Sequence, residues 1–74
     1  MKYTVLYDGE IERGFAFPDT AQHRDVANAL KRFGLPVSAG FIRISGEVEC
    51  YGQSDSLGLK SNPEDALHFA QLMR

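Results

Sequence analysis

Apolar and polar residues alternate most regularly within residues 38–66, where the pattern predicts two strands followed by a helix. The first strand covers 41–44 and, after a tight turn, the second covers 48–51. A polar loop, Gly52 to Ser61, leads to a helix capped by Asn62, because a following proline favours the extended backbone of an N-cap. Helical spacing predicts an inner stripe of Ala66, Phe69, Ala70 and Met73, supported by Leu67 and Leu72.

A three-residue turn, 45–47, fixes how the two strands of this hairpin pair. Counting outward from the turn sets Ile44 opposite Val48, and side chains then alternate between the two faces. The face toward the core receives Ile42, Ile44, Val48 and Cys50. The other face receives Phe41 opposite Tyr51 and Arg43 opposite Glu49.

The start of the chain predicts a second, less regular hairpin. Residues 2–7 are rich in β-branched and aromatic side chains, which favour a strand. Asp8 and Gly9 form a turn signal, because glycine tolerates the positive φ of tight turns. The return strand covers 11–17, and Gly14 in its middle indicates a bulge.

A helix follows this first hairpin. Asp19 with Gln22 fits a capping box, and Thr20 is the alternative cap. Gly34 suits the left-handed position after a helix, and Pro36 prevents its continuation. The inner face consists of Val26, Leu30 and Phe33, flanked by Ala27 and Ala29.

The element order ββαββα predicts an α+β fold with two layers, in which two helices pack on one face of a four-stranded, largely antiparallel sheet. The length of 74 residues allows one small domain, covering residues 1–74. The halves 1–35 and 36–74 can be laid on one another, and a duplication that left a pseudo-repeat is one explanation of the match. The alternative is that two similar hairpin turns arose independently.

The amino-acid composition argues against several classes of function. The hydrophobic fraction of 43% is that of a globular protein, and the net charge of −2 argues against general binding to nucleic acid or membrane surfaces. A single cysteine excludes an intramolecular disulfide, and the first apolar run is too short for a secretory signal. We therefore expect a cytoplasmic protein with no membrane segment.

Few residues offer catalytic or metal-binding chemistry. We expect Cys50, His23 and His68 to be structural or exposed, and the sequence predicts no catalytic residue, no metal site and no cofactor. The loop from Gly52 to Asn62, with Lys60 beside a helix start, is either an anion site or a connection whose two leucines cover a core edge.

If both helices cover one face, the other face is open and carries aromatic residues. The residues expected to bind a partner there are Phe41, Arg43, Glu49, Tyr51, Tyr3 and Tyr7. The sequence thus favours a non-catalytic protein-interaction module, a stoichiometric regulator or inhibitor that binds a protein partner or forms a homodimer. The alternative is a small domain that binds RNA or single-stranded DNA.

Overall fold

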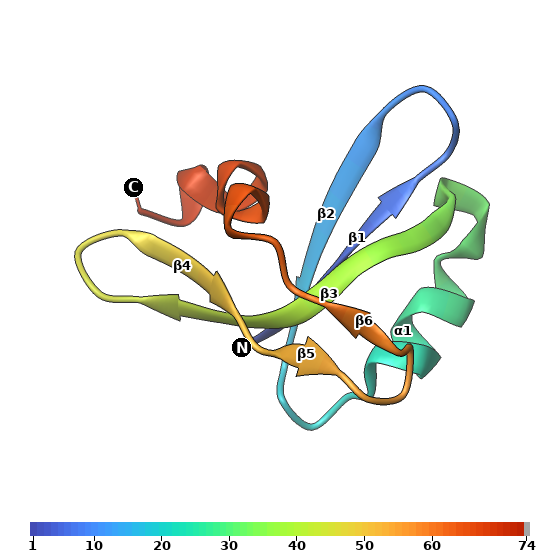
Figure 1. The fold of residues 1–74 in the computed structure, drawn as a ribbon, viewed down its shortest axis with the longest axis horizontal. Helices are drawn as coiled ribbons and strands as arrows, with labels where there is room; N and C mark the ends of the chain where they lie inside the picture. Colours follow the sequence, from blue (N-terminus) through green and yellow to red (C-terminus); the bar gives the residue numbers. More distant parts are fainter. Residues whose placement is uncertain (74) are drawn as a thin grey trace.

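The computed structural model describes residues 1–73, and the side chains of residues 1–70. It has a small α+β fold, built on a four-stranded antiparallel sheet in the order β2-β1-β3-β4 (Figure 1). This confirms the predicted fold class. The strands are β1 (Lys2–Tyr7), β2 (Glu12–Phe17), β3 (Leu35–Ile44), β4 (Val48–Tyr51), β5 (Gln53–Ser54) and β6 (Leu59–Lys60). The helices are α1 (His23–Ala29) and the 3₁₀ helices η1 (Lys31–Phe33) and η2 (Pro63–Met73).

The β3–β4 hairpin has the predicted register. Ile44 pairs with Val48 and Ile42 with Cys50 on one face, and the remaining pairs are Arg43 with Glu49 and Phe41 with Tyr51. Ile42 is buried, and Val48 and Cys50 pack against the core. Ile44 was expected in the core but is 46% exposed. It is the last residue of β3 before the turn, where the hairpin extends past the core.

The β1–β2 hairpin is held at its turn by Asp8. Its carboxylate accepts hydrogen bonds from the backbone N–H groups of Glu10 and Ile11 and from the Arg13 guanidinium. The predicted bulge at Gly14 is wrong, because β1 and β2 pair without a break. Glycine is needed there because a Cβ atom would lie 2.7 Å from the Cβ of His68 in η2.

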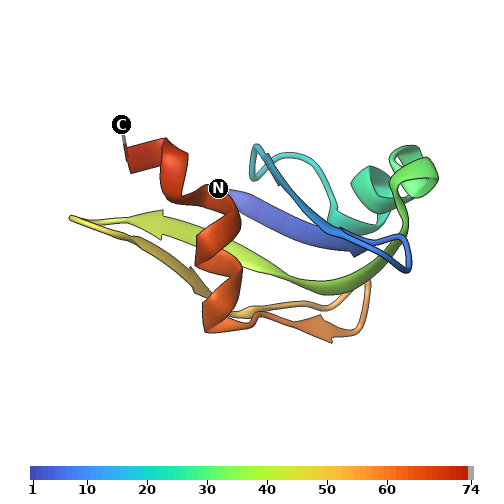
Figure 2. The same ribbon diagram turned by 90° about the horizontal axis from the view of Figure 1, so that it is seen from above.

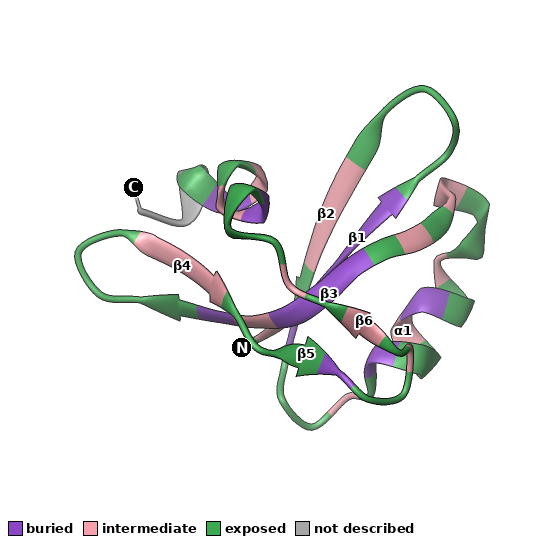
Figure 3. Ribbon diagram, viewed as in Figure 1, coloured by how far each residue is buried: buried purple, intermediate pink, exposed green. Residues whose placement is uncertain are grey.

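β3 is longer than predicted and begins at Leu35. Its first half pairs with β1, and the register shifts at Val37, which is the extra residue of a bulge. β1 and β3 are therefore the two central strands. Their residues form most of the buried band in Figure 3.

The contacts place α1 and η2 on opposite faces of the sheet. Tyr3 of β1 packs edge-on against Phe69 of η2. Lys2, the neighbouring residue, points to the other face, where its partners Phe17 and Phe41 lie. Both of these rings pack against His23 of α1. The expectation that both helices share one face is therefore not met. Figure 2 shows η2 crossing the strands at one end of the sheet and α1 at the other end.

α1 begins later than predicted. Its N-cap is Gln22, whose side chain makes no capping hydrogen bond, so neither Asp19 nor Thr20 caps the helix. Asp19 instead pairs with the N-terminal ammonium group at 3.1 Å. The predicted helix is shorter than expected at its other end as well, because α1 ends at Ala29 with Leu30 as its C-cap. The separate 3₁₀ helix η1 follows, and Gly34, with a φ of 127°, is its C-cap.

η2 has the predicted cap. The Asn62 side chain accepts a hydrogen bond from the Glu64 N–H at 3.0 Å, and the Asp65 carboxylate accepts one from the Asn62 N–H at 3.1 Å. These reciprocal bonds form a capping box.

The predicted inner stripe of η2 is only partly correct. Phe69 is buried and Ala66 half-buried, but Ala70 and Leu67 are exposed, and Met73 and Leu72 lie outside the described side chains. A 3₁₀ helix repeats every three residues, which moves part of an α-helical stripe off the buried face.

No helix within residues 1–73 is long and apolar enough to cross a membrane.

Candidate functional site

Four of the six predicted partner-binding residues lie together on one face of the β3–β4 hairpin. We call this set, Phe41, Arg43, Glu49 and Tyr51, the β3–β4 surface. The hairpin register places them as two cross-strand pairs, and α1 contacts this set at Phe41, whose ring packs against His23. Tyr51 remains 45% exposed, and the side chain of Arg43 is 60% exposed.

The residues of the β3–β4 surface hold one another in place. The Phe41 and Tyr51 rings stack with centroids 5.8 Å apart, and the Arg43 guanidinium carbon lies 5.1 Å from the Tyr51 centroid. The Arg43 Nε donates to a Glu49 carboxylate oxygen at 3.1 Å. This hydrogen bond, with the charge of Glu49, raises the pKa of Arg43 above its ordinary value. The surface therefore carries a paired arginine and carboxylate beside a stacked aromatic pair.

The other two predicted residues do not belong to this surface. Tyr3 was expected on an open sheet face, and that expectation is wrong, because the residue has no exposed surface and lies in the core beneath η2. Tyr7 is 42% exposed but lies at the opposite end of β1, where its hydroxyl donates to the Gly9 carbonyl. Tyr7 pairs with Glu12 and Leu35, far along the sheet from β4.

The expected open face is smaller than predicted because α1 and η1 cover much of it. Phe15 packs against Phe33 of η1 at 5.4 Å, and Phe41 packs against His23 at 5.9 Å. His23 is buried, and its Nε2 lies 2.8 Å from the Gly40 carbonyl oxygen, so this nitrogen donates to β3. The histidine has a structural role.

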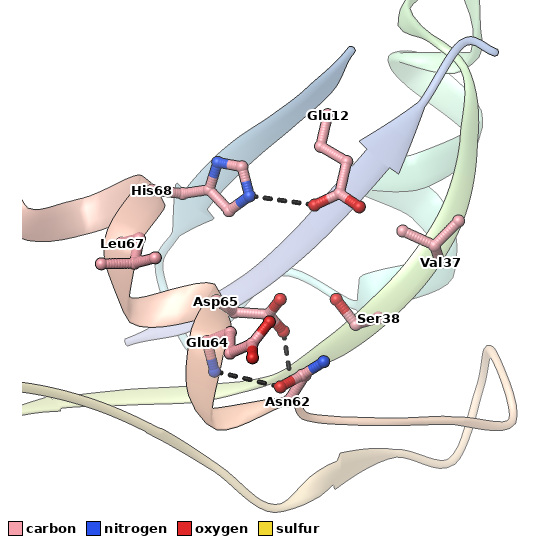
Figure 4. Close-up of a pocket in the computed structure, with 8 residues that line it drawn as sticks. All are labelled: Glu12, Val37, Ser38, Asn62, Glu64, Asp65, Leu67 and His68. Carbon is pink, nitrogen blue, oxygen red and sulfur yellow. Dashed lines mark hydrogen bonds and ion pairs between the residues drawn. The ribbon is translucent and has the colours of Figure 1, made fainter. Parts of the chain in front are cut away.

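The structure also contains a pocket that sequence reasoning missed. It lies where η2 passes β2 and β3, and has a volume of about 380 Å³ (Figure 4). We call it the acidic pocket, and its lining consists of Glu12, Val37, Ser38, Asn62, Glu64, Asp65, Leu67 and His68. Three carboxylates and one histidine line it. The residues come from three distant parts of the chain, so no local pattern could have revealed the pocket.

Two polar contacts order the walls of the acidic pocket. His68 Nε2 lies 3.2 Å from a Glu12 carboxylate oxygen, which ties η2 to β2. Asp65 is buried, and its Oδ2 accepts a hydrogen bond from the Tyr3 hydroxyl at 2.6 Å. Burial and this carboxylate raise the pKa of Tyr3 well above its ordinary value. The neighbouring Cys50 thiol also has a raised pKa, chiefly through burial.

One buried polar atom near the floor of the acidic pocket has no partner. Ser38 is 7% exposed, and its hydroxyl oxygen makes no hydrogen bond. It is the only such side-chain atom identified among the described residues. Figure 4 shows the Ser38 side chain on β3 beside Asp65 and Asn62.

The loop from Gly52 to Asn62 forms a small hairpin, β5–β6, in place of an irregular loop. The backbone N–H groups at the end of this loop make hydrogen bonds within the chain. The Ser61 N–H donates to the Gly52 carbonyl, and the Asn62 N–H donates to the Asp65 carboxylate. Leu57 and Leu59 are half-buried. These contacts favour the connecting role over an anion site.

Chemically, the described residues offer binding groups and few reactive ones. No three or more His, Cys, Asp and Glu side chains in the described part of the chain are grouped so that they could hold a metal ion. No family model matches the chain, and the comparisons with curated proteins and with solved structures give no match. The two candidate sites are therefore the β3–β4 surface and the acidic pocket.

Proposed function

We propose that this chain is a small non-catalytic protein-interaction module, a stoichiometric regulator or inhibitor that binds a protein partner, or a second copy of itself, through the β3–β4 surface. One observation carries the proposal. Tyr51, stacked on Phe41 and contacted by Arg43, stays nearly half exposed.

The residue types on this surface support protein binding. Tyrosine and arginine are enriched at the energetic centres of protein interfaces. Their mutual contacts hold the side chains before a partner arrives, which lowers the entropy lost on binding. Phe41 is also held in place from the core side, because its ring packs against the buried His23.

A non-catalytic role agrees with the state of the reactive groups. His23 is bonded to a backbone carbonyl and His68 to a carboxylate, so neither contacts a nucleophile. The raised pKa of Cys50 disfavours its reactive thiolate form. A partly buried single thiol also suits the reducing cytoplasm, where we place the protein.

The contacts of Arg43 favour a protein partner over nucleic acid. A nucleic-acid site of this type needs a cation for the phosphate and an aromatic face for the base. Here the guanidinium is paired with Glu49 and lies over the Tyr51 ring. A phosphate would have to displace the carboxylate, and a base would have to displace the arginine.

Light scattering across a concentration series tests self-association first. If the chain dimerises through the β3–β4 surface, Tyr51→Ala weakens the dimer at least about tenfold, the loss of a moderate interface contact. Tyr7→Ala is the matched control, because Tyr7 has a similar exposure and lies away from this surface. An equal effect of both variants would contradict the proposal.

If the wild-type chain is monomeric, affinity capture from a lysate of the source cell identifies the partner. We expect a captured protein to be retained by the Tyr7→Ala variant and lost from the Tyr51→Ala and Arg43→Ala variants. A captured protein that the Tyr51→Ala and Arg43→Ala variants retain as well as the wild type does would refute the proposed surface. Binding to an oligonucleotide mixture that weakens steeply with salt would support the nucleic-acid alternative, because phosphate contacts release counterions.

A further inference from the structure

We propose that the acidic pocket binds an organic cation, a guanidinium or alkylammonium group carried on an aliphatic stem. This site lies on the sheet face that η2 covers, opposite the β3–β4 surface, so the proposal does not depend on that surface.

The charge of the acidic pocket selects for a cation. Glu12, Glu64 and Asp65 all line it, and His68 is the only basic side chain in the lining. His68 contacts Glu12, so Glu64 and Asp65 have no cationic partner in the described residues. Both hydrogen bonds to Asp65 end on Oδ2, which leaves Oδ1 to accept from a ligand.

The unpartnered hydroxyl of Ser38 is the second, independent observation. A buried polar atom without a hydrogen bond is costly, and native proteins contain few of them. A guanidinium or ammonium group has several N–H donors, so it can satisfy this oxygen and a carboxylate together. The position of Ser38 beside Asp65 fits such a shared ligand (Figure 4).

The rim of the acidic pocket suits an aliphatic stem. Leu67 is 80% exposed and Val37 is 44% exposed, and both line the pocket. Long cationic side chains place their methylene groups on apolar surface and their charge against polar groups. The lining carboxylates are not grouped closely enough to hold a metal ion, but a planar guanidinium can contact carboxylates that lie further apart.

Titration followed by backbone amide NMR shifts tests the site. The probes are capped arginine (N-acetylarginine methylamide) and capped citrulline, a neutral group of nearly the same shape. We expect capped arginine to shift the amides of Ser38, Asp65 and Leu67, and capped citrulline to leave them in place. Butylguanidinium, a free cation with the same single charge as capped arginine, is the second arm, and the tighter of the two cations identifies the source as a peptide or a free small molecule.

Single substitutions locate the ligand. Glu12→Gln and Glu64→Gln each weaken binding of capped arginine about tenfold, as expected for loss of a charge-assisted hydrogen bond. Glu47→Gln is the matched control, because Glu47 is an exposed carboxylate in the β3–β4 turn, outside the pocket.

Ser38→Ala separates a ligand contact from a structural role. The hydroxyl makes no hydrogen bond within the chain, so its removal leaves the fold intact, yet it weakens capped arginine about fivefold through the lost acceptor. Equal shifts with capped citrulline, or wild-type affinity in both glutamate variants, would overturn the proposal, as would the absence of any shift with either cation.

Discussion

The hydrogen bond from Tyr3 to Asp65 is the best place to test how this fold is held together. It joins the first strand to the last helix, with a separation of 62 residues along the chain. Tyr3 is fully buried, and Asp65 is 5% exposed. The substitution Tyr3→Phe removes the hydroxyl and keeps the ring, whose edge-on contact with Phe69 at 5.4 Å is preserved.

The expected loss follows from what remains after the substitution. Asp65 stays buried and keeps only the hydrogen bond from the Asn62 N–H. Hydrogen bonds to charged groups contribute about 1.5–3 kcal/mol, so we expect Tyr3→Phe to lower the free energy of unfolding by about 2 kcal/mol. With a urea m-value of about 1 kcal/mol/M for a small domain, the unfolding midpoint falls by about 2 M.

Urea unfolding followed by circular dichroism measures this loss. Tyr7→Phe is the control, because the Tyr7 hydroxyl donates to a carbonyl at an exposed turn, and its loss costs about 0.5 kcal/mol. If Tyr3→Phe were no more destabilising than Tyr7→Phe, the buried hydrogen bond would contribute nothing and our account of the core would be wrong.

The same residue predicts an alkaline limit to stability. Burial and the Asp65 carboxylate raise the pKa of Tyr3 above its ordinary value of 10.0. Because the folded state then holds its proton more tightly than the unfolded state, this contribution is complete below pH 10 and declines as the pH rises beyond it. We expect Tyr3→Phe to show a weaker decline above pH 10, measured by urea midpoints across that range.

Three further predictions concern single positions in a strand, a helix cap and a hairpin turn. Gly14→Ala places a Cβ 2.7 Å from the His68 Cβ and should cost about 1–3 kcal/mol by forcing η2 away from β2, measured by thermal unfolding. Asn62→Ala removes the cap of η2 and should cost about 1 kcal/mol in the same assay, with Asn62→Asp restoring most of it. Asp8 has a pKa lowered to about 2 by backbone N–H groups and Arg13, so its contribution is present above its ordinary 3.8 and is lost as the pH falls toward 2. Asp8→Ala should flatten stability between those pH values, and an unchanged acid profile would show that the Asp8 contacts do not stabilise the fold.

Features fixed by neighbouring residues could be predicted from the sequence. The register of the β3–β4 hairpin followed from its turn length and alternation, and the cap at Asn62 followed from the proline after it. The pairing of Arg43 with Glu49 is a direct consequence of that register. Each of these depends on contacts within about ten residues, which a local pattern records.

The acidic pocket could not be predicted, because its walls meet only in the folded chain. Glu12 and His68 are 56 residues apart, and nothing in either local sequence indicates that they touch. The unpartnered Ser38 hydroxyl is likewise visible only once β3 is placed beneath η2. Gly14 in the middle of a strand indicated a special position, but glycine is needed there because η2 packs close to β2 and not because β2 has a bulge.

The placement of the helices on opposite faces did leave a trace in the sequence, in β1. A strand covered on one face alternates buried and exposed residues, whereas a strand covered on both faces is buried throughout. Residues 3–6 of β1 all have no exposed surface, and in the sequence three of these four residues, Tyr3, Val5 and Leu6, are apolar or aromatic. Read as evidence for two covered faces, this run predicts one helix on each side of the sheet. It also predicts that Tyr3 belongs to the core and that only the ends of the faces, including the β3–β4 surface, stay open to a partner.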